Sequence, residues 1–201
     1  PLGVRTPIVQ KIANRYYQKI RTKNKNEVFV LCDQLFQKHT FEETMIALSW
    51  LRKQNKDFVE KDFIRMENWL KKYINNWAFC DEYCTHAFGY FILKYPQFLP
   101  KIKLWTKSTN RWFRRASAVI LIPLAKQKKY LPNIFETAQI LLQDKDDLVQ
   151  KGYGWMLKVA SNYFPKEVFE FVMSRKEKMP RTALRYAIEK YPKKIRQCAM
   201  E

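Results

Sequence analysis

Apolar residues recur along this chain at the spacing of α-helices. In the C-terminal part they follow the i, i+3, i+4, i+7 pattern at Leu184, Ala187, Ile188 and Tyr191. A similar stripe begins at Phe135, and no segment alternates apolar and polar residues as a half-buried strand would. The segments 88–93 and 119–124 are apolar on all sides, which is typical of helices packed between neighbours. The pattern predicts an all-α fold.

An internal repeat is visible in a tyrosine that is followed within two residues by a proline. It recurs in KYPQ, YLPN, YFPK and YPKK, at Pro96, Pro132, Pro165 and Pro192. Because proline lacks a backbone N–H, each of these residues ends the apolar helix before it, and a second helix begins after it. Helix pairs of this kind stack into an α-solenoid with a concave groove. We predict a right-handed α-solenoid of degenerate helix pairs that forms a single domain over residues 1–201.

The charge of the chain narrows the class of partner. Its 38 Lys and Arg residues outnumber 19 Asp and Glu residues, which gives a formal net charge of +19. An excess of this size indicates a polyanionic partner, either nucleic acid or an acidic membrane surface. The basic residues are spread along the chain and are not collected on one amphipathic helix, which favours nucleic acid bound in a basic groove. The 15% aromatic content excludes a disordered chain, and only 4 glycines argue against a glycine-looped nucleotide fold.

No segment has the length of a membrane span. The longest uncharged apolar stretch, residues 116–125, is about half as long as a bilayer requires. The chain starts with PLGVRTP and shows no secretion signal. We therefore expect a cytoplasmic protein in a reducing, intracellular compartment.

Three of the 4 cysteines of the chain allow two interpretations. A metal site could combine Cys80, Cys84 and His86 with Cys32 and His39. Paired zinc ligands normally lie on a tight turn, whereas the segment WAFCDEYCTHAFGYF has the pattern of a continuous helix. We therefore interpret these cysteines as small buried hydrophobic residues and expect neither a metal nor another cofactor.

Charged and aromatic residues gather at positions that are equivalent between the repeats. They lie in the segments 75–84, 110–118, 149–158 and 180–190. Equivalent positions of a solenoid line the same face. This predicts one concave surface that carries Trp77, Trp112, Arg115, Lys151, Trp155, Arg181 and Arg185.

Within these segments, side chains pair at helical spacing. Trp77 and Asp81 are one turn apart, which places an indole beside a carboxylate, although a core tryptophan and a helix-capping or solvated aspartate would show the same spacing. Guanidinium groups suit phosphate oxygens, and Arg111, Arg114 and Arg115 form a compact basic group. Arg114 and Arg115 are about 100° apart on the helix, so they cannot share a role. A solvated basic face is the alternative for this group.

A basic and aromatic face is also predicted further along the chain. Lys151, Trp155 and Lys158 follow one another on one side of a helix. Cations that flank an aromatic ring are typical of a nucleic-acid surface, where the cations contact the backbone and the ring is available to a base or sugar.

Four short motifs of the chain resemble, in order and spacing, those of a known family. GVRTP (3–7), NWAFCD (76–81), RWFRRASAV (111–119) and KGYGWMLK (151–158) are similar to segments of the DNA alkylation repair proteins of the AlkD type. The resemblance implies a HEAT-like repeat fold and a DNA glycosylase that removes N3- or N7-alkylated purines from double-stranded DNA. We expect a monomer. The resemblance also implies that further helices precede the GVRTP segment in such proteins, and that the damaged base stays in the duplex.

The resemblance assigns roles to individual residues. The essential aspartate of the family falls on Asp81, its tryptophan on Trp77, its groove arginine on Arg115 and its second lesion-facing tryptophan on Trp155. The remaining basic and aromatic candidates would then bind DNA, namely Arg111, Trp112, Arg114, Lys151, Lys158, Arg181 and Arg185. The alternatives are a nucleic-acid-binding helical-repeat protein without catalysis and a protein-interaction scaffold.

Overall fold

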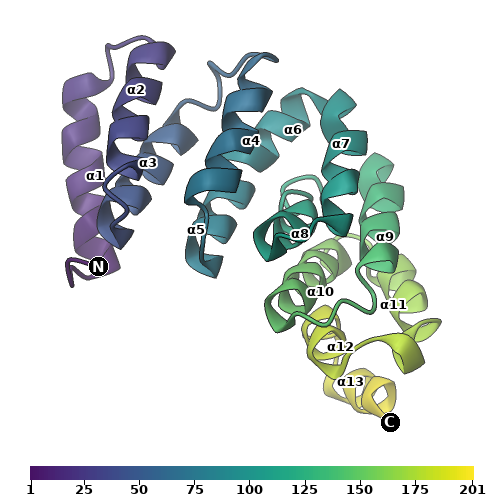
Figure 1. Ribbon diagram of the computed structural model, residues 1–201. Coiled ribbons are helices and arrows are strands. Elements are labelled where there is room, and N and C mark those ends of the chain that lie inside the picture. Colours follow the sequence, from purple (N-terminus) through teal and green to yellow (C-terminus); the bar gives the residue numbers. More distant parts are fainter. The chain divides into compact units, whose positions relative to one another are not determined.

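The computed structural model describes all 201 residues, and every regular element in it is a helix (Figure 1). The all-α prediction is therefore confirmed. The chain forms two compact units, Pro1–Phe91 and Ile92–Glu201. The predictions of a single domain and of a right-handed solenoid with a concave groove stay predictions. None of the helices combines the length and the apolar character of a membrane span.

The first unit is built around helix α3. Its elements are α1 (Thr6–Ile20), α2 (Lys25–Phe36), α3 (Phe41–Lys53), α4 (Asp62–Tyr73), α5 (Trp77–Glu82), the π-helix η1 (Tyr83–Phe88) and the start of α6 (Gly89–Lys94). Helix α3 packs against α1, α2, α5 and η1. The buried aromatic side chains keep their polar atoms bonded, since the indole N–H of Trp50 donates to the Ala13 carbonyl at 2.9 Å and the Tyr83 hydroxyl donates to the Met66 carbonyl at 3.0 Å.

The second unit is built around helix α10. Its elements after α6 are η2 (Pro96–Phe98), α7 (Leu99–Leu104), η3 (Trp105–Lys107), α8 (Arg111–Val119), η4 (Lys128–Tyr130), α9 (Leu131–Ile140), α10 (Asp147–Ser161), α11 (Pro165–Met173), η5 (Lys176–Lys178), α12 (Arg181–Ala187) and α13 (Lys193–Met200). Helix α10 packs against α8, α9, α11 and α12. Most of its length is buried, so it forms the core of this unit.

The repeated prolines stand where helices begin, as predicted. Pro132 and Pro165 occupy the first turn of α9 and α11, Pro96 opens η2, and Pro192 is the N-cap of α13. Backbone N–H groups in the first turn of a helix have no hydrogen-bond partner within the helix, so proline loses nothing there by lacking one. Its fixed φ also matches the helical conformation. The sequence therefore located these helix starts correctly.

The segment 119–124 departs from the prediction. It is mostly buried, as expected, but α8 ends at Val119 and successive turns follow. The Leu121 N–H donates to the Ala118 carbonyl at 3.0 Å, and the Leu124 N–H donates to the Leu121 carbonyl at 3.0 Å. Pro123 has no N–H to continue a helical ladder, and its ring would clash with the preceding turn. An all-apolar sequence predicted burial here but not helix.

A glycine allows α10 and α12 to approach each other closely. A Cβ atom on Gly154 would lie 2.7 Å from Cβ of Tyr186 and 2.9 Å from the backbone oxygen of Ala183. On the neighbouring face of α10, a Cβ atom on Gly152 would lie 3.2 Å from Cγ of Arg115. The Gly154 contacts are below 3.0 Å and include the backbone of Ala183, which cannot move alone. The Gly152 contact is longer and involves only a side-chain carbon, so a shift of a few tenths of an ångström in Arg115 relieves it.

We expect Gly154→Ala to lower the free energy of unfolding by about 1–3 kcal/mol, because overpacking against α12 outweighs a gain of about 1 kcal/mol in helix propensity. Urea unfolding followed by circular dichroism measures this change. Gly152→Ala is the matched control, since it brings the same gain in propensity and meets only a side chain. Equal or higher stability of Gly154→Ala relative to Gly152→Ala would contradict the close contact.

Candidate nucleic-acid interface

Helix α5 presents Trp77 and Asp81 on a face that points out of the core. The helix begins after Asn76, whose Oδ1 accepts a hydrogen bond from the Phe79 N–H at 3.0 Å. Trp77 is 58% exposed and Asp81 is half-buried, whereas Phe79 and Cys80 on the other side are buried. The interpretation of Trp77 as a core residue is therefore wrong. An exposed indole stands one helical turn from a carboxylate.

The helix that carries these residues continues as a π-helix. In η1 the turns are wider than in an α-helix, and π-helical turns occur frequently at functional sites. The Thr85 hydroxyl donates to the backbone carbonyl of Asp81 at 2.6 Å. The segment is helical throughout, as predicted, but nothing in the sequence indicated its π-helical part.

The cysteines near this helix lie in the core. Cys32, Cys80 and Cys84 are buried, and the sulfur atoms of Cys80 and Cys84 are 4.0 Å apart. Their interpretation as small buried hydrophobic residues is confirmed. Cys198 in α13 is exposed.

A charged network lies directly after Asp81. The Nδ1 atom of His86 is 3.2 Å from a carboxylate oxygen of Glu82, and Nη1 of Arg52 is 3.8 Å from the other oxygen. The side-chain amide of Asn55 donates to the His86 carbonyl at 2.8 Å. Burial raises the pKa of Glu82, but the hydrogen bond from His86 and the charges of His86 and Arg52 lower it by more, so the pKa lies below its ordinary value.

In the second unit, Arg111 and Arg114 are paired with aspartates. Nη2 of Arg111 is 2.5 Å from Oδ2 of Asp146, and Nε of Arg114 donates to Oδ2 of Asp144 at 2.7 Å. Asp146 is also the N-cap of α10, where its Oδ1 accepts from the Leu148 N–H at 2.9 Å. These arginines therefore join the start of α8 to the loop before α10.

Arg115 has a different environment from Arg114, as their angular separation predicted. It is only 5% exposed, and its Nη1 donates to the backbone carbonyl of Leu148 in α10. Trp112 is half-buried, with the Arg111 guanidinium 5.8 Å from its ring centroid. The compact basic group of the sequence is therefore divided between a buried arginine and ion-paired arginines.

Lys151, Trp155 and Lys158 are all partly exposed on one side of α10. Nζ of Lys151 is 2.5 Å from the Asp147 carboxylate, and this hydrogen bond raises the pKa of Lys151. Nζ of Lys158 is 2.6 Å from the Glu189 carboxylate, and this hydrogen bond lowers the pKa of Glu189. The predicted face exists, but carboxylates neutralise its cations.

A cavity of about 530 Å³ opens between α10, α12 and α13. It brings the predicted residues Lys151 and Arg185 together with Arg196 and Tyr186, which the sequence analysis did not select. Arg185 and Arg196 form no salt bridge, although the carboxylates of Asp147 and Glu189 also line this cavity and the charge of Arg196 contributes to the lowered pKa of Glu189. The predicted Arg181 lies outside it, with its Nη1 3.4 Å from the Met200 carbonyl. The basic run KKIR was the available signal for Arg196.

Comparison with models of protein families identifies one family that covers most of this chain. The model of a family described as DNA alkylation repair enzyme matches residues 1–191. None of the curated proteins matches this chain significantly.

Several solved structures have a fold similar to that of this chain. A protein from Enterococcus faecalis, described as a predicted DNA alkylation repair enzyme, is 19% identical with a TM-score of 0.83, covering 95% of this chain and 88% of its own. AlkD2 from Streptococcus mutans is 22% identical with a TM-score of 0.67, covering 96% and 92%. The protein smu.31 from Streptococcus mutans UA159 is 23% identical with a TM-score of 0.60, covering 96% and 89%. At these identities the likeness shows the fold alone.

We expect Glu82→Gln to lower the free energy of unfolding at pH 7 by about 1 kcal/mol, because His86 and Arg52 lose their charged partner. A lowered pKa contributes stability above the unfolded-state pKa, and this contribution is lost as the pH falls through the folded-state value. The difference from wild type should therefore shrink below about pH 4. Urea unfolding at both pH values tests this, with Glu60→Gln, an exposed acid without a salt bridge, as the control.

Proposed function

Because the chain belongs to the DNA alkylation repair enzyme family, we propose that it is a DNA glycosylase that excises N3- or N7-alkylated purines from double-stranded DNA. The observation that carries the proposal is the exposed indole of Trp77 one turn from the Asp81 carboxylate, on a face turned away from the core. The formal net charge of +19 supports a polyanionic substrate.

The chemistry of the proposed substrate explains why a single carboxylate and two tryptophans can suffice for base excision. A 3- or 7-alkylpurine already carries positive charge, so it leaves without protonation and no general acid is required. As the glycosidic bond breaks, positive charge develops on the deoxyribose, as in an oxocarbenium ion. In our proposal the Asp81 carboxylate stabilises this charge and orients the attacking water. The hydrogen bond from Thr85 to the Asp81 carbonyl supports the backbone that positions the carboxylate.

The tryptophans supply attraction for the cationic base and sugar. A cation over an indole face gains about 0.5–2 kcal/mol, depending on how far it is desolvated. We propose this role for Trp77 in the first unit and for Trp155 in the second. Arg115 would act from a fixed position, since its side chain is buried and held by the Leu148 carbonyl.

The cations of the second unit would bind the DNA backbone with different strength. Arg185 carries no carboxylate partner, so it can meet a phosphate without breaking an ion pair. For Arg111, Arg114, Lys151 and Lys158, a phosphate oxygen must replace an aspartate or glutamate oxygen. We therefore assign the largest phosphate contribution to Arg185, with Trp112 and Arg181 as further contacts.

We expect Asp81→Asn to reduce the rate of base release from methylated duplex DNA by at least about 100-fold, since the stabilising charge is lost. Chromatography of free 3-methyladenine and 7-methylguanine measures the rate, and fluorescence anisotropy with labelled duplex measures affinity. Binding should change little, because Asp81 adds no attraction for phosphate.

Asp57→Asn is the matched control, since it removes an exposed carboxylate of the same unit. Its excision rate should equal that of wild type. If wild type releases no base above the spontaneous rate yet binds duplex, the protein is a nucleic-acid-binding module without catalysis. If neither activity is present, a protein-interaction scaffold becomes the better explanation.

We expect Arg185→Gln to weaken duplex binding several-fold. The slope of the logarithm of the binding constant against the logarithm of the salt concentration should fall by about 1, the amount expected for the loss of one phosphate contact. Anisotropy titrations over a series of salt concentrations give both values. Lys178→Gln removes an exposed charge that does not line the cavity, so it serves as the control. Equal slopes for the two variants would show that Arg185 is not a phosphate contact.

A further inference from the structure

A smaller cavity of about 270 Å³ lies in the first unit, beside the start of α5. Four aromatic rings, those of Phe36, Phe41, Tyr73 and Phe79, form part of its wall, and Pro1, His39, Thr44, Asn75 and Asn76 complete it. Phe36 and Tyr73 are stacked with centroids 5.0 Å apart and planes at 9°, and Phe41 and Phe79 are stacked at 5.1 Å and 29°. Stacked pairs of rings therefore border the cavity, and flat apolar surfaces of this kind suit a planar ligand.

Polar groups without a partner in the protein also line this cavity. Thr44 is 97% buried, at 3% exposure, and its hydroxyl makes no hydrogen bond to another residue. The Tyr73 hydroxyl and the His39 imidazole likewise make no hydrogen bond. The Thr44 hydroxyl is not among the buried polar atoms that lack a partner, so it faces the space of the cavity, where it can bind solvent or a ligand. These groups can therefore bond to the polar edge of a ligand whose ring faces lie against the aromatic walls.

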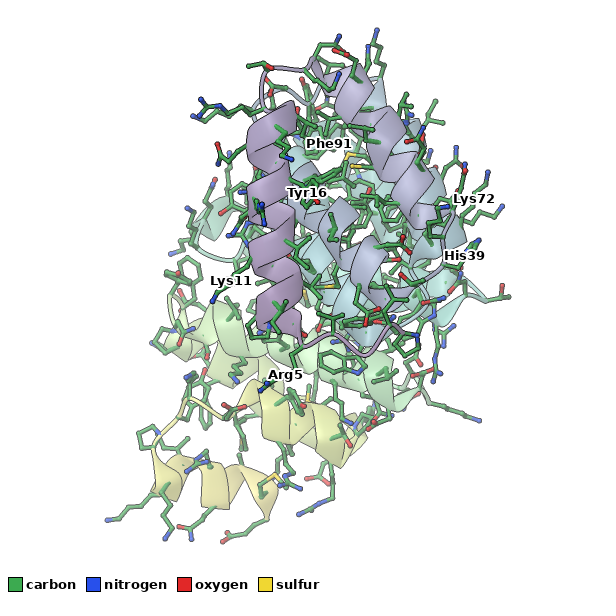
Figure 2. The ribbon with its side chains drawn as sticks, turned by 90° about the vertical axis from the view of Figure 1, so that its left-hand side faces the viewer. Arg5, Lys11, Tyr16, His39, Lys72 and Phe91 are labelled. Carbon is green, nitrogen blue, oxygen red and sulfur yellow. The ribbon has the colours of Figure 1, made fainter.

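The backbone turns His39 toward these rings. His39 lies in the left-handed region with φ 54°, and its imidazole centroid is 6.0 Å from that of Tyr73. Figure 2 shows His39 at one edge of the unit together with Lys72, and Lys11 on α1 at the opposite edge.

The charges around the cavity restrict the ligand further. No lysine, arginine, aspartate or glutamate side chain lines it. The lining groups that can carry positive charge are the amino group of Pro1 and the His39 imidazole, so a nucleotide phosphate would find no lysine or arginine here, whereas an uncharged or singly charged ring would lose no essential partner. The volume is also below the range of about 300–1,000 Å³ that holds drug-sized ligands. The small volume and the absence of lysine and arginine side chains favour one free heteroaromatic base over a whole nucleotide.

We propose that this cavity binds a free purine base, stacked on the aromatic walls and hydrogen-bonded to Thr44 and Tyr73. Asn76 lines the cavity and is also the N-cap of the helix that carries Trp77 and Asp81. A base released near Asp81 would therefore find a binding site beside the helix that released it. The identity of the base as an alkylated purine rests on the proposed function, whereas binding of a purine does not.

Isothermal titration of the full chain with 7-methylguanine, guanine and guanosine monophosphate tests the proposal. We expect saturable binding of 7-methylguanine and guanine, and at least threefold weaker binding of the nucleotide. Preference for 7-methylguanine over guanine would indicate a product site, and equal binding would indicate a site for free purines in general. Absence of saturable binding of both bases, or tighter binding of the nucleotide, would overturn the proposal.

Substitutions in the cavity identify the site. Thr44→Val keeps the shape of the side chain and removes the hydroxyl, and Tyr73→Phe removes a hydroxyl from a half-buried ring, so we expect each to weaken base binding at least threefold. Tyr16→Phe removes an exposed hydroxyl of α1 and is the control. Unchanged binding in both folded cavity variants would place the base elsewhere.

The Asp81→Asn variant separates this proposal from the proposed function. It should still bind the base, because Asp81 does not line the cavity. If wild type excises no alkylated base but binds purines, the proposed function fails and the cavity assignment stands. If wild type excises alkylated bases without binding them in the cavity, the assignment fails and the function stands.

Discussion

The close approach of α10 to its neighbours is the constraint on which the second unit depends. Gly154 lets the backbone of α12 come so near that a single methyl group would collide with it, and Gly152 leaves room for the Arg115 side chain. Helix α10 also packs against α9 and α11, so its position fixes that of most other helices in the unit. The Asp146 cap and the cavity that contains Arg185 both lie on this helix or beside it. Backbone proximity at one glycine thus determines where the candidate DNA contacts stand.

In the first unit, one hydrogen bond has a comparable effect. The Asn76 side chain caps α5 and fixes the direction in which the helix starts. Trp77 and Asp81 follow within the next turns, and the opposite face is held by buried Phe79 and Cys80. Because Asn76 also lines the aromatic cavity, the same residue connects the candidate catalytic helix with the proposed purine site.

The electrostatics of the chain are less simple than its net charge. A formal charge of +19 indicates a surplus of cations, yet several of the cations nearest the candidate interface are paired with carboxylates from the loop before α10, from the turn after α12 or from the preceding turn of the same helix. The more exposed of these ion pairs, such as Lys151–Asp147, contribute little stability, so a phosphate can compete for the cation. They do restrict the side chains to a few positions, which makes the interface more ordered before DNA binds.

The sequence by itself determined the helical class, because apolar spacing reports directly on the face that a helix buries. It also located helix starts at Pro132 and Pro165, since the missing N–H of proline acts locally. It selected Trp77 and Asp81 as neighbours, because residues one turn apart on a helix share a face regardless of the rest of the fold. Local geometry thus sufficed for these features.

Only the tertiary structure decided the rest. The exposure of Trp77, the burial of Arg115 and the pairing of Arg114 with Asp144 depend on helices far away in the sequence. The turns at 119–124 and the aromatic cavity around Thr44 likewise arise from contacts that no spacing rule describes. Periodicity records which side of a helix is apolar, whereas burial, partners and cavities depend on what the chain places against that side.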